Sequence, residues 1–311
     1  MTQMHDLSRV LWSQGLFLQP QHFQQFERVQ RVEAQLQFDA FGSHAWGLSE
    51  YEIDEVALKR STFALRRCQG RFPDGGVFST IHGTPLPLPL EITPALEGKK
   101  IFLAIPLEQP GEDNHAREPA HYAARRQRVM VADLRDDTEP RMESAPVEVT
   151  LPNLKLIAGD SATSGHAVIP LAVVDTLARD GTVQLAGNFV PSVLRGTASS
   201  FLPEVCRDIH SRMQVRSKAM SGRSVASGRL ASTEHFLEAT MLMAMNRYLP
   251  VFEELGRSCP LHPYQAYLLC AQAAGELATY SSVTSVAPSF PGYRHEDQYG
   301  SFAPVLSSLM A

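Results

Sequence analysis

The chain has 311 residues, of which 44% are hydrophobic and 20% are charged, and its net charge is -5. This balance is typical of a globular protein, and at about 150 residues per domain the length allows two domains. The acidic balance, with a pI near 6.1, argues against a surface for nucleic acid or an anionic membrane. No apolar run is long enough for a signal peptide or a membrane-spanning helix. We therefore expect a cytoplasmic protein that binds no nucleic acid and does not insert into a membrane.

The cysteines and the densest basic run give no sign of a metal or cofactor site. The cysteines form no CxxC pair and have no metal-ligand spacing, which suits free thiols in a reducing cytoplasm: Cys68, Cys206, Cys259 and Cys270. The basic run consists of Arg125, Arg126 and Arg128, and acidic residues such as Glu112 and Glu118 stand close to it in the sequence. We predict that this run is a solvated loop of mixed charge.

The first predicted element is a helix that begins at Pro20, because proline suits the first turn of a helix. Apolar residues then recur every three or four positions and mark one face: Phe23, Phe26, Val29, Val32 and Leu36. The stripe is narrow and glutamines flank it, which favours a helix that packs loosely or lies between subunits. Residues 41–47, with the sequence FGSHAWG, are predicted to form a turn.

From about Glu52 to Leu185 short apolar runs alternate with Pro, Gly and Asp, which is typical of strands and turns. The predicted strands are 56–58, 62–66, 77–81, 101–107, 129–134, 147–151, 154–157, 167–174 and 182–185. Most intervals leave no room for a helix of ten residues, so parallel βαβ units are not expected. The pattern predicts an antiparallel β-sandwich or barrel.

Two segments in this half have a distinct composition. RFPDGGVF (71–78) predicts a tight turn before a strand, since proline presets φ and glycine accepts a positive φ. TPLPLPLEITP (84–94) alternates proline with leucine, which favours extended, polyproline-like backbone and excludes a central strand. This segment is either a docking arm or a packed loop between strands, and the packed loop is the favoured interpretation.

Beyond the sequence NFVPS (188–192) the periodicity becomes helical. We predict helices over 201–220, 232–256 and 262–280, and another that begins near Gly300, which together suggest a small bundle. The predicted class is therefore α+β, with a β-rich domain over 1–190 and a helical domain over 191–311. The chain stops within the apolar pattern VLSSLMA (305–311), so we expect it to be part of a longer protein.

No catalytic motif occurs in the sequence. G-x-S-x-G, P-loop, G-x-G-x-x-G and HExxH patterns are lacking. YRHED (293–297) places His295 beside Glu296 and Asp297, and a hydrolase site there is the enzymatic alternative. A hydrogen-bonded loop is the favoured interpretation of this cluster, so we expect no catalytic residues, no cofactor and no metal.

The N-terminal segment WSQGLFLQPQHFQQ (12–25) closely resembles the signature of the TssK family, also called ImpJ or VasE, of type VI secretion baseplate subunits. That signature runs Trp, x, Glu, Gly, aliphatic, Phe/Leu, x, Pro, Gln, His, Phe, Gln, and here Gln14 stands where glutamate is commoner. Further matching pieces follow in order along the whole chain: FPDGGVF (72–78), NFVPS (188–192), HPYQAYLLCAQAAGELATY (262–280) and PGYRHEDQYGSF (291–302).

The resemblance implies a homotrimeric, non-catalytic adaptor that works at the cytoplasmic face of the inner membrane. It implies a β-rich shoulder similar to that of phage receptor-binding proteins, a helical neck and a C-terminal head. The shoulder would dock on the TssF/TssG wedge of the baseplate, and the head would contact the TssJ/TssL/TssM membrane complex. This chain would supply the shoulder and the neck and would lack the head. A phage-derived attachment protein is the remaining alternative.

The predicted partner-binding residues are the apolar and aromatic ones around the start of the first helix: Trp12, Phe17, Leu18, Pro20, His22 and Phe23. Aromatic side chains beside a proline-started helix are rigid apolar anchors of the kind that dominate interface energies. The competing interpretation is that Trp12 and Phe17 pin the N-terminal arm to the β-rich domain. The sequence favours neither.

Overall fold

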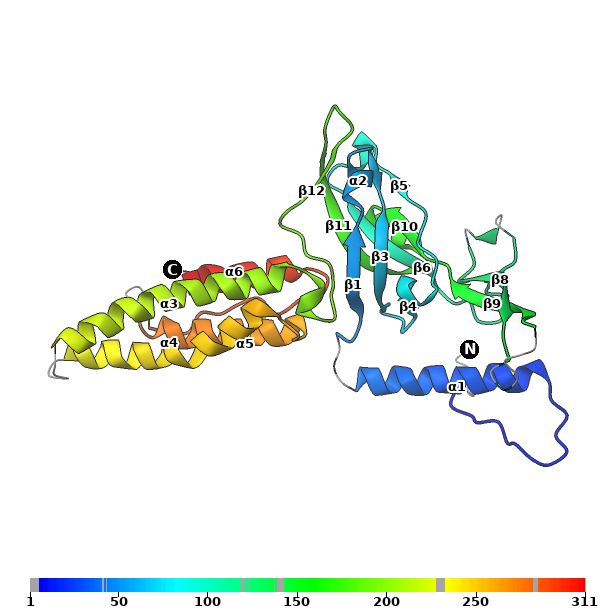
Figure 1. Cartoon of the computed structure of the whole chain (residues 1–311), viewed down its shortest axis with the longest axis horizontal. Coiled ribbons are helices and arrows are strands. Elements are labelled where there is room, and N and C mark those ends of the chain that lie inside the picture. The colour runs from blue at the N-terminus through cyan, green and yellow to red at the C-terminus, as the bar shows by residue number, and fades with distance from the viewer. Residues whose placement is uncertain are drawn as a thin grey trace. The chain divides into compact units, whose positions relative to one another are not determined.

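The structure is a computed structural model that describes residues 6–40, 42, 44–118, 121–122, 124–136, 138, 143–227, 233–281 and 285–310, without the side chains of residues 222–235. The chain divides into two compact units, Met1–Ala45 and Trp46–Ala311, which are described separately. Figure 1 shows the elements of each unit.

The N-terminal unit contains one helix, α1 (Pro20–Asp39), preceded by an extended segment. The helix begins where predicted, with Pro20 in its first turn, and only Val29 of its apolar stripe is buried. Arg9 forms an ion pair with Glu33 at 2.7 Å, and Gln25 Nε2 donates a hydrogen bond to Ser8 O at 2.7 Å. These contacts fold the extended segment back along the helix. Two residues of the predicted turn, Phe41 and Ser43, lie outside the described residues.

The strands of the second unit form several sheets. One sheet has the order β1-β3-β4, and a larger one has the order β10-β6-β11-β12. A third has the order β7-β8-β9, and β2 pairs with β5. The strand bounds are β1 Gly47–Ile53, β2 Thr62–Phe63, β3 Leu65–Arg71, β4 Val77–Ser79, β5 Leu90–Glu91, β6 Lys100–Pro106, β7 His115–Ala116, β8 Gln127–Leu134, β9 Ala145–Pro152, β10 Lys155–Ala158, β11 His166–Leu177 and β12 Val183–Leu185.

The first two sheets share one hydrophobic core. Its buried members come from both: Leu48, Cys68, Phe72 and Phe78 from or beside the first, and Ile101, Leu103, Ile169 and Val174 from the second. Strand β6, with the sequence KIFLAIP, lies between β10 and β11, and its side chains are buried on both faces of the sheet from the second residue onward. A run without polar alternation is typical of such a central strand.

The structure differs from the strand predictions in several places. Residues 56–58 form a helical turn, α2 (Glu55–Leu58), because the Asp54 side chain accepts hydrogen bonds from Val56 N and Ala57 N and caps it. Strand β1 was not predicted, since its sequence GLSEYEI contains three polar residues. The pairing is antiparallel in these sheets except between β7 and β8, which run parallel.

The helical part of the second unit consists of α3 (Phe201–Ser227), α4 (Thr233–Arg257), α5 (Pro263–Ala278) and α6 (Gln298–Met310). Helices α3 and α4 form a long hairpin, and α5 and α6 lie against the part of it nearer the strands (Figure 1). Apolar side chains from all of them form a second core, with Leu202, Ile209, Phe252, Tyr267 and Phe302 among its members. Helix α4 ends at Arg257, one residue beyond the predicted end at Gly256, and it continues through Pro250.

The observed class is α+β, with antiparallel sheets in the N-terminal part followed by a helical region, as predicted. The change from strands to helices falls between Leu185 and Phe201. The division into domains 1–190 and 191–311 stays a prediction. The predicted first residue of α4, Ser232, and the last residue, Ala311, lie outside the described residues.

Candidate protein-interaction surface

The N-terminal unit carries an aromatic cluster centred on Trp12. Its ring lies 6.3 Å from the rings of His22 and Phe23 and 6.4 Å from that of Phe26, measured between centroids. The Phe26 contact is edge-on, an arrangement that aromatic pairs favour. Trp12 nevertheless stays 51% exposed, and Phe23 and Phe26 are exposed as well. The rings of the cluster thus pack against one another while much of their surface stays exposed to solvent.

The start of α1 fixes the position of this cluster. Pro20 occupies the first turn, and Gln19 and His22 form a reciprocal capping box in which Gln19 N donates to His22 Nδ1 at 3.0 Å. The imidazole of His22 thus satisfies a backbone donor while its ring packs beside Trp12. Of the predicted partner-binding residues, His22 has a clear local role that maintains the helix start.

Phe17 and Leu18 lie between a turn at residues 13–16 and the start of α1. The turn closes with Leu16 N donating to Ser13 O at 3.2 Å, and Gly15 has a φ of 82°, which favours glycine. Phe17 is 81% exposed and Leu18 is also exposed. The structure therefore brings Trp12, His22 and Phe23 together in the cluster, whereas Phe17 and Leu18 are exposed in the segment that leads into α1. Their role in partner binding stays a prediction.

The enzymatic alternative at His295 does not agree with the geometry. His295 is 1% exposed, and its Nε2 lies 2.8 Å from the Trp46 carbonyl, which can only accept. Nε2 therefore carries the proton, and Nδ1 accepts from the Tyr293 hydroxyl at 2.8 Å. Burial, and then the charge of Glu296, raise the pKa of Tyr293, so the phenol remains a donor. Both ring nitrogens are engaged, and His295 joins two parts of the fold.

The acidic neighbours of His295 have structural positions too. Asp297 Oδ1 accepts from Gly300 N at 3.0 Å at the start of α6, and its carboxylate pairs with Arg294. Glu296 is exposed. Asp297 thus acts as a helix cap, which matches the favoured interpretation of this segment as a hydrogen-bonded loop.

Three of the motif segments meet around His295. Ser192 Oγ donates to the His295 carbonyl at 2.9 Å, and the His262 ring stacks on the His295 ring with centroids 5.2 Å apart. Ser192 O also accepts from Leu48 N at 2.9 Å, which attaches β1 to the same place. A Cβ at Gly47 would lie 2.6 Å from Ser192 O, so this close approach requires glycine. These motifs join the strands to the helices.

The predicted solvated loop at 125–128 is wrong for Arg126. Arg126 is 8% exposed, and its Nη1 lies 2.7 Å from Asp74 Oδ2 and 2.9 Å from the Pro106 carbonyl. Asp74 belongs to the FPDGGVF segment, and a Cβ at Gly76 would lie 2.4 Å from Arg126 Nη2. Sequence reasoning missed this pair because its members are 52 residues apart.

The buried thiols also have structural roles. Burial raises the pKa of Cys68 and that of Cys270 to about 12. The Cys206 thiol donates to Cys259, which raises the pKa of Cys206, and burial acts in the same direction. Within the described residues, no group of three or more His, Cys, Asp or Glu side chains has an arrangement that could hold a metal ion.

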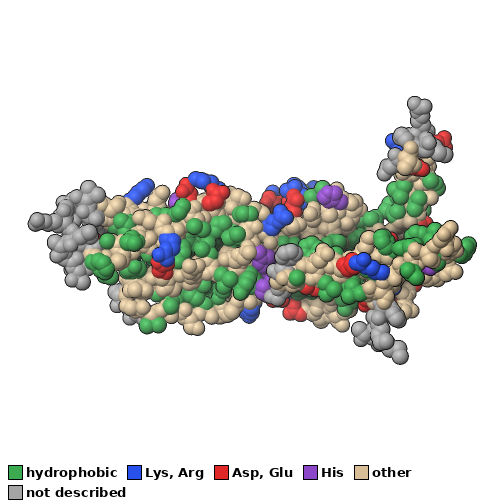
Figure 2. All heavy atoms as spheres, turned by 90° about the horizontal axis from the view of Figure 1, so that it is seen from below, with side chains coloured by type: hydrophobic (Ala, Val, Ile, Leu, Met, Phe, Trp, Pro, Cys, Tyr) green, Lys and Arg blue, Asp and Glu red, His purple; other side chains and the backbone are tan. Residues whose placement is uncertain are grey.

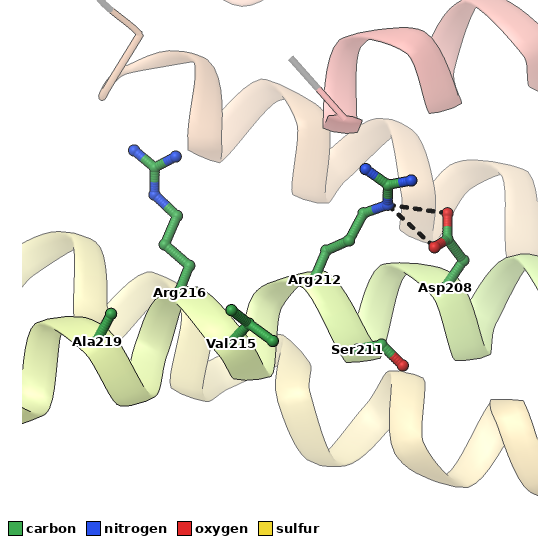
Figure 3. Close-up of a pocket in the computed structure, with 6 residues that line it drawn as sticks. All are labelled: Asp208, Ser211, Arg212, Val215, Arg216 and Ala219. Atoms are coloured by element: carbon green, nitrogen blue, oxygen red, sulfur yellow. Dashed lines mark hydrogen bonds and ion pairs between the residues drawn. The ribbon is translucent and has the colours of Figure 1, made fainter.

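A shallow hollow of about 600 Å³ lies along α3 and is lined by Asp208, Ser211, Arg212, Val215, Arg216 and Ala219 (Figure 3). Both carboxylate oxygens of Asp208 accept from Arg212 Nε at 3.0 Å. All six residues come from one helix, so the hollow brings no convergent set of catalytic groups together. On the face shown in Figure 2, acidic and basic side chains lie intermixed among apolar ones.

The chain matches a known protein family over residues 22–311, described as "Bacterial Type VI secretion, VC_A0110, EvfL, ImpJ, VasE". It is 29% identical over 302 residues to the type VI secretion system baseplate component TssK1 of Pseudomonas aeruginosa, covering 97% of this chain and 68% of TssK1. A crystal structure of TssK has the same fold, with a TM-score of 0.89 at 23% identity, covering 97% of this chain and 68% of that one. A chain of a TssK-TssF-TssG baseplate subcomplex, solved by cryo-electron microscopy, gives a TM-score of 0.84 at 25% identity, covering 98% and 97%.

The fold and these matches define a structural, non-enzymatic component of a bacterial secretion system. The chain belongs to the VasE/ImpJ family of type VI secretion, whose TssK members are baseplate components. In the described part of the chain, no helix is long and apolar enough to cross a membrane.

Proposed function

We propose that this chain is the shoulder and neck of a homotrimeric baseplate adaptor. In this proposal the β-rich part and the N-terminal unit dock on a TssF/TssG wedge. A C-terminal head would connect the assembly to the TssJ/TssL/TssM membrane complex at the inner face of the inner membrane. The shoulder would be a β-sandwich of the kind found in phage receptor-binding proteins.

One observation carries the docking part of the proposal: the aromatic cluster around Trp12 is ordered by a helix cap and yet stays exposed. A pre-formed aromatic surface loses little conformational freedom when a partner binds, so more of its contact energy appears as affinity. The relative solved in complex with TssF and TssG supports that wedge as the partner.

The proposal of a trimer rests on apolar side chains of α4 that are not buried in the helical bundle. Phe236 is 68% exposed and Met243 is 69% exposed, and they lie seven residues apart on one face of the helix. Exposed apolar patches of this kind normally mark interfaces. We expect them to face a second copy of the neck.

Sedimentation of the full-length protein tests the trimer, and pulldown with purified TssF–TssG tests the docking. We expect a trimer that binds the wedge, and a Phe236→Asp, Met243→Asp double variant that sediments as a smaller species. Val77→Asp on β4, where Val77 is 67% exposed, is the control and should sediment as wild type. If the wild-type protein is a monomer at every concentration, the proposed trimer is wrong. If it is a trimer that does not bind TssF–TssG, the proposed docking is wrong.

A further inference from the structure

The segment between β4 and β5 alternates proline and leucine from Pro85 to Leu90. Residues 84–89 belong to no strand or helix, although β5 follows at once. Each proline fixes its own φ near -65°, and each residue before a proline is kept out of the helical region. Alternation of the two restrictions favours the polyproline II conformation.

Burial along this segment follows a period of three. Thr84 and Pro87 are buried, and Leu90 packs against the core shared by the sheets. Polyproline II has three residues per turn, so these residues form one face. Thr84 anchors that face, because its N–H donates to Ser79 O at 3.0 Å and its Oγ1 accepts from Ser79 N at 3.1 Å. The segment is therefore held against the domain as a rigid ridge.

The other two faces of the ridge point outward. One carries Pro85 and Leu88, and the other carries Leu86 and Pro89. Leu88 is 76% exposed and Leu86 is 41% exposed. We call residues 85–89 the proline ridge. One face of the proline ridge is thus packed against the domain, as the packed-loop interpretation expects. The other two faces are exposed and apolar and could contact a partner, as the docking-arm interpretation expects.

The chemistry of the proline ridge restricts what can bind it. Pro85, Pro87 and Pro89 have no N–H and stand at alternate positions, so a partner strand cannot pair with the edge that they form. Residues 84–90 carry no charge, so an ion pair with the ridge is excluded as well. What remains is apolar contact with a grooved, left-handed ridge, and grooves lined by aromatic side chains recognise this shape in proteins.

We propose that the proline ridge docks into a groove lined by aromatic side chains on the TssF/TssG wedge. This proposal rests on the proposed function, which assigns wedge docking to the β-rich part of the chain. The ridge is pre-ordered by its prolines, so it binds with a small loss of conformational entropy. It would add a second, chemically different contact to that of the N-terminal aromatic cluster.

The test compares binding of purified TssF–TssG to the full-length wild-type protein and to a Leu86→Ala, Leu88→Ala variant. We expect the variant to bind at least about tenfold more weakly, the scale of one anchor residue, while it stays folded at the assay temperature. Val131→Ala on β8, where Val131 is 61% exposed, is the control and should bind as wild type. Equal binding by wild type and double variant overturns the proposed role of the proline ridge but leaves the proposed function standing. Failure of the wild type to bind overturns the proposed function and the ridge with it.

A peptide experiment tests the backbone conformation separately. A peptide with the sequence of residues 84–91 should compete with the full-length protein for purified TssF–TssG, whereas the same peptide with its three prolines replaced by alanine should not. Equal competition by the two peptides, or competition by neither at millimolar concentration, overturns the polyproline II mode of binding.

Discussion

Replacing Phe17 by alanine separates a docking role from a packing role in the N-terminal segment. Phe17 is 81% exposed, so about a fifth of its side chain is hidden from water. For a side chain of roughly 200 Å² this is about 40 Å², or about 1 kcal/mol at about 25 cal/mol per Å². If Phe17 anchors the wedge, its loss costs about 2 kcal/mol or more of binding, which is about 30-fold in Kd.

The assay measures both quantities on the same preparation. Urea unfolding gives the free energy of unfolding, and titration with purified TssF–TssG gives Kd. We expect Phe17→Ala to lower stability by at most about 1 kcal/mol and to weaken binding by about 30-fold. Val77→Ala, which truncates an exposed apolar residue on β4, should leave both quantities near wild type.

Trp12→Ala gives a less clear separation. About half of Trp12 is hidden, which corresponds to an upper bound of about 3 kcal/mol of stability for a side chain of roughly 250 Å². Its effects on folding and binding therefore overlap. The docking argument is refuted if Phe17→Ala binds the wedge with wild-type Kd, or if it loses several kcal/mol of stability while the folded fraction still binds.

Three further predictions concern the interior. Arg126→Ala should lower the free energy of unfolding, measured in urea, by about 2–4 kcal/mol because it leaves Asp74 unpaired. Arg125→Ala, which removes an exposed ion pair, should lower it by under about 1 kcal/mol. Equal losses would contradict the argument that burial makes the Arg126 pair the stronger one. His295→Ala should cost about 2–4 kcal/mol by the same measurement, since the Trp46 carbonyl loses its donor and a cavity remains; a neutral effect would contradict the role of His295 as a link. Burial raises the pKa of Cys68 from its ordinary value of 9.0 to about 12. The stabilisation is therefore full below about pH 9 and falls by up to about 1.4 kcal/mol per pH unit toward pH 12. A Cys68→Ala variant should show a shallower alkaline decline, and an unchanged one would refute the assignment.

The sequence predicted the elements whose signal is local. Pro20 marked the start of α1, and the apolar run at 101–107 marked β6, because both depend on neighbouring residues. Residues 56–58 have strand-forming side chains, but the Asp54 cap forms a helical turn, a competition that propensity alone does not resolve. The predicted end of α4 at Gly256 agrees with the structure within one residue, and the helix passes through Pro250 while Tyr248, Phe252 and Leu255 pack in the core.

The candidate site was predicted in its position but not in its detail. The aromatic residues around Trp12 are close in sequence, so their proximity in space follows from the helix start. The contact of His295 with the Trp46 carbonyl joins residues 249 positions apart, and the Arg126–Asp74 pair joins residues 52 apart. Such contacts depend on tertiary packing, and no periodicity in a single sequence encodes them. The proline ridge combines the two situations. Its backbone conformation follows from the local sequence, but which of its faces is buried depends on packing against the core.

Hydrogen exchange of the full-length protein, with and without purified TssF–TssG, tests the central claim most directly. We predict that the wedge slows amide exchange in residues 12–23, in the extended segment and first turn of α1, where few amides take part in regular structure. Slower exchange confined to α3–α6, or no change anywhere in the chain, would contradict wedge docking through the N-terminal surface.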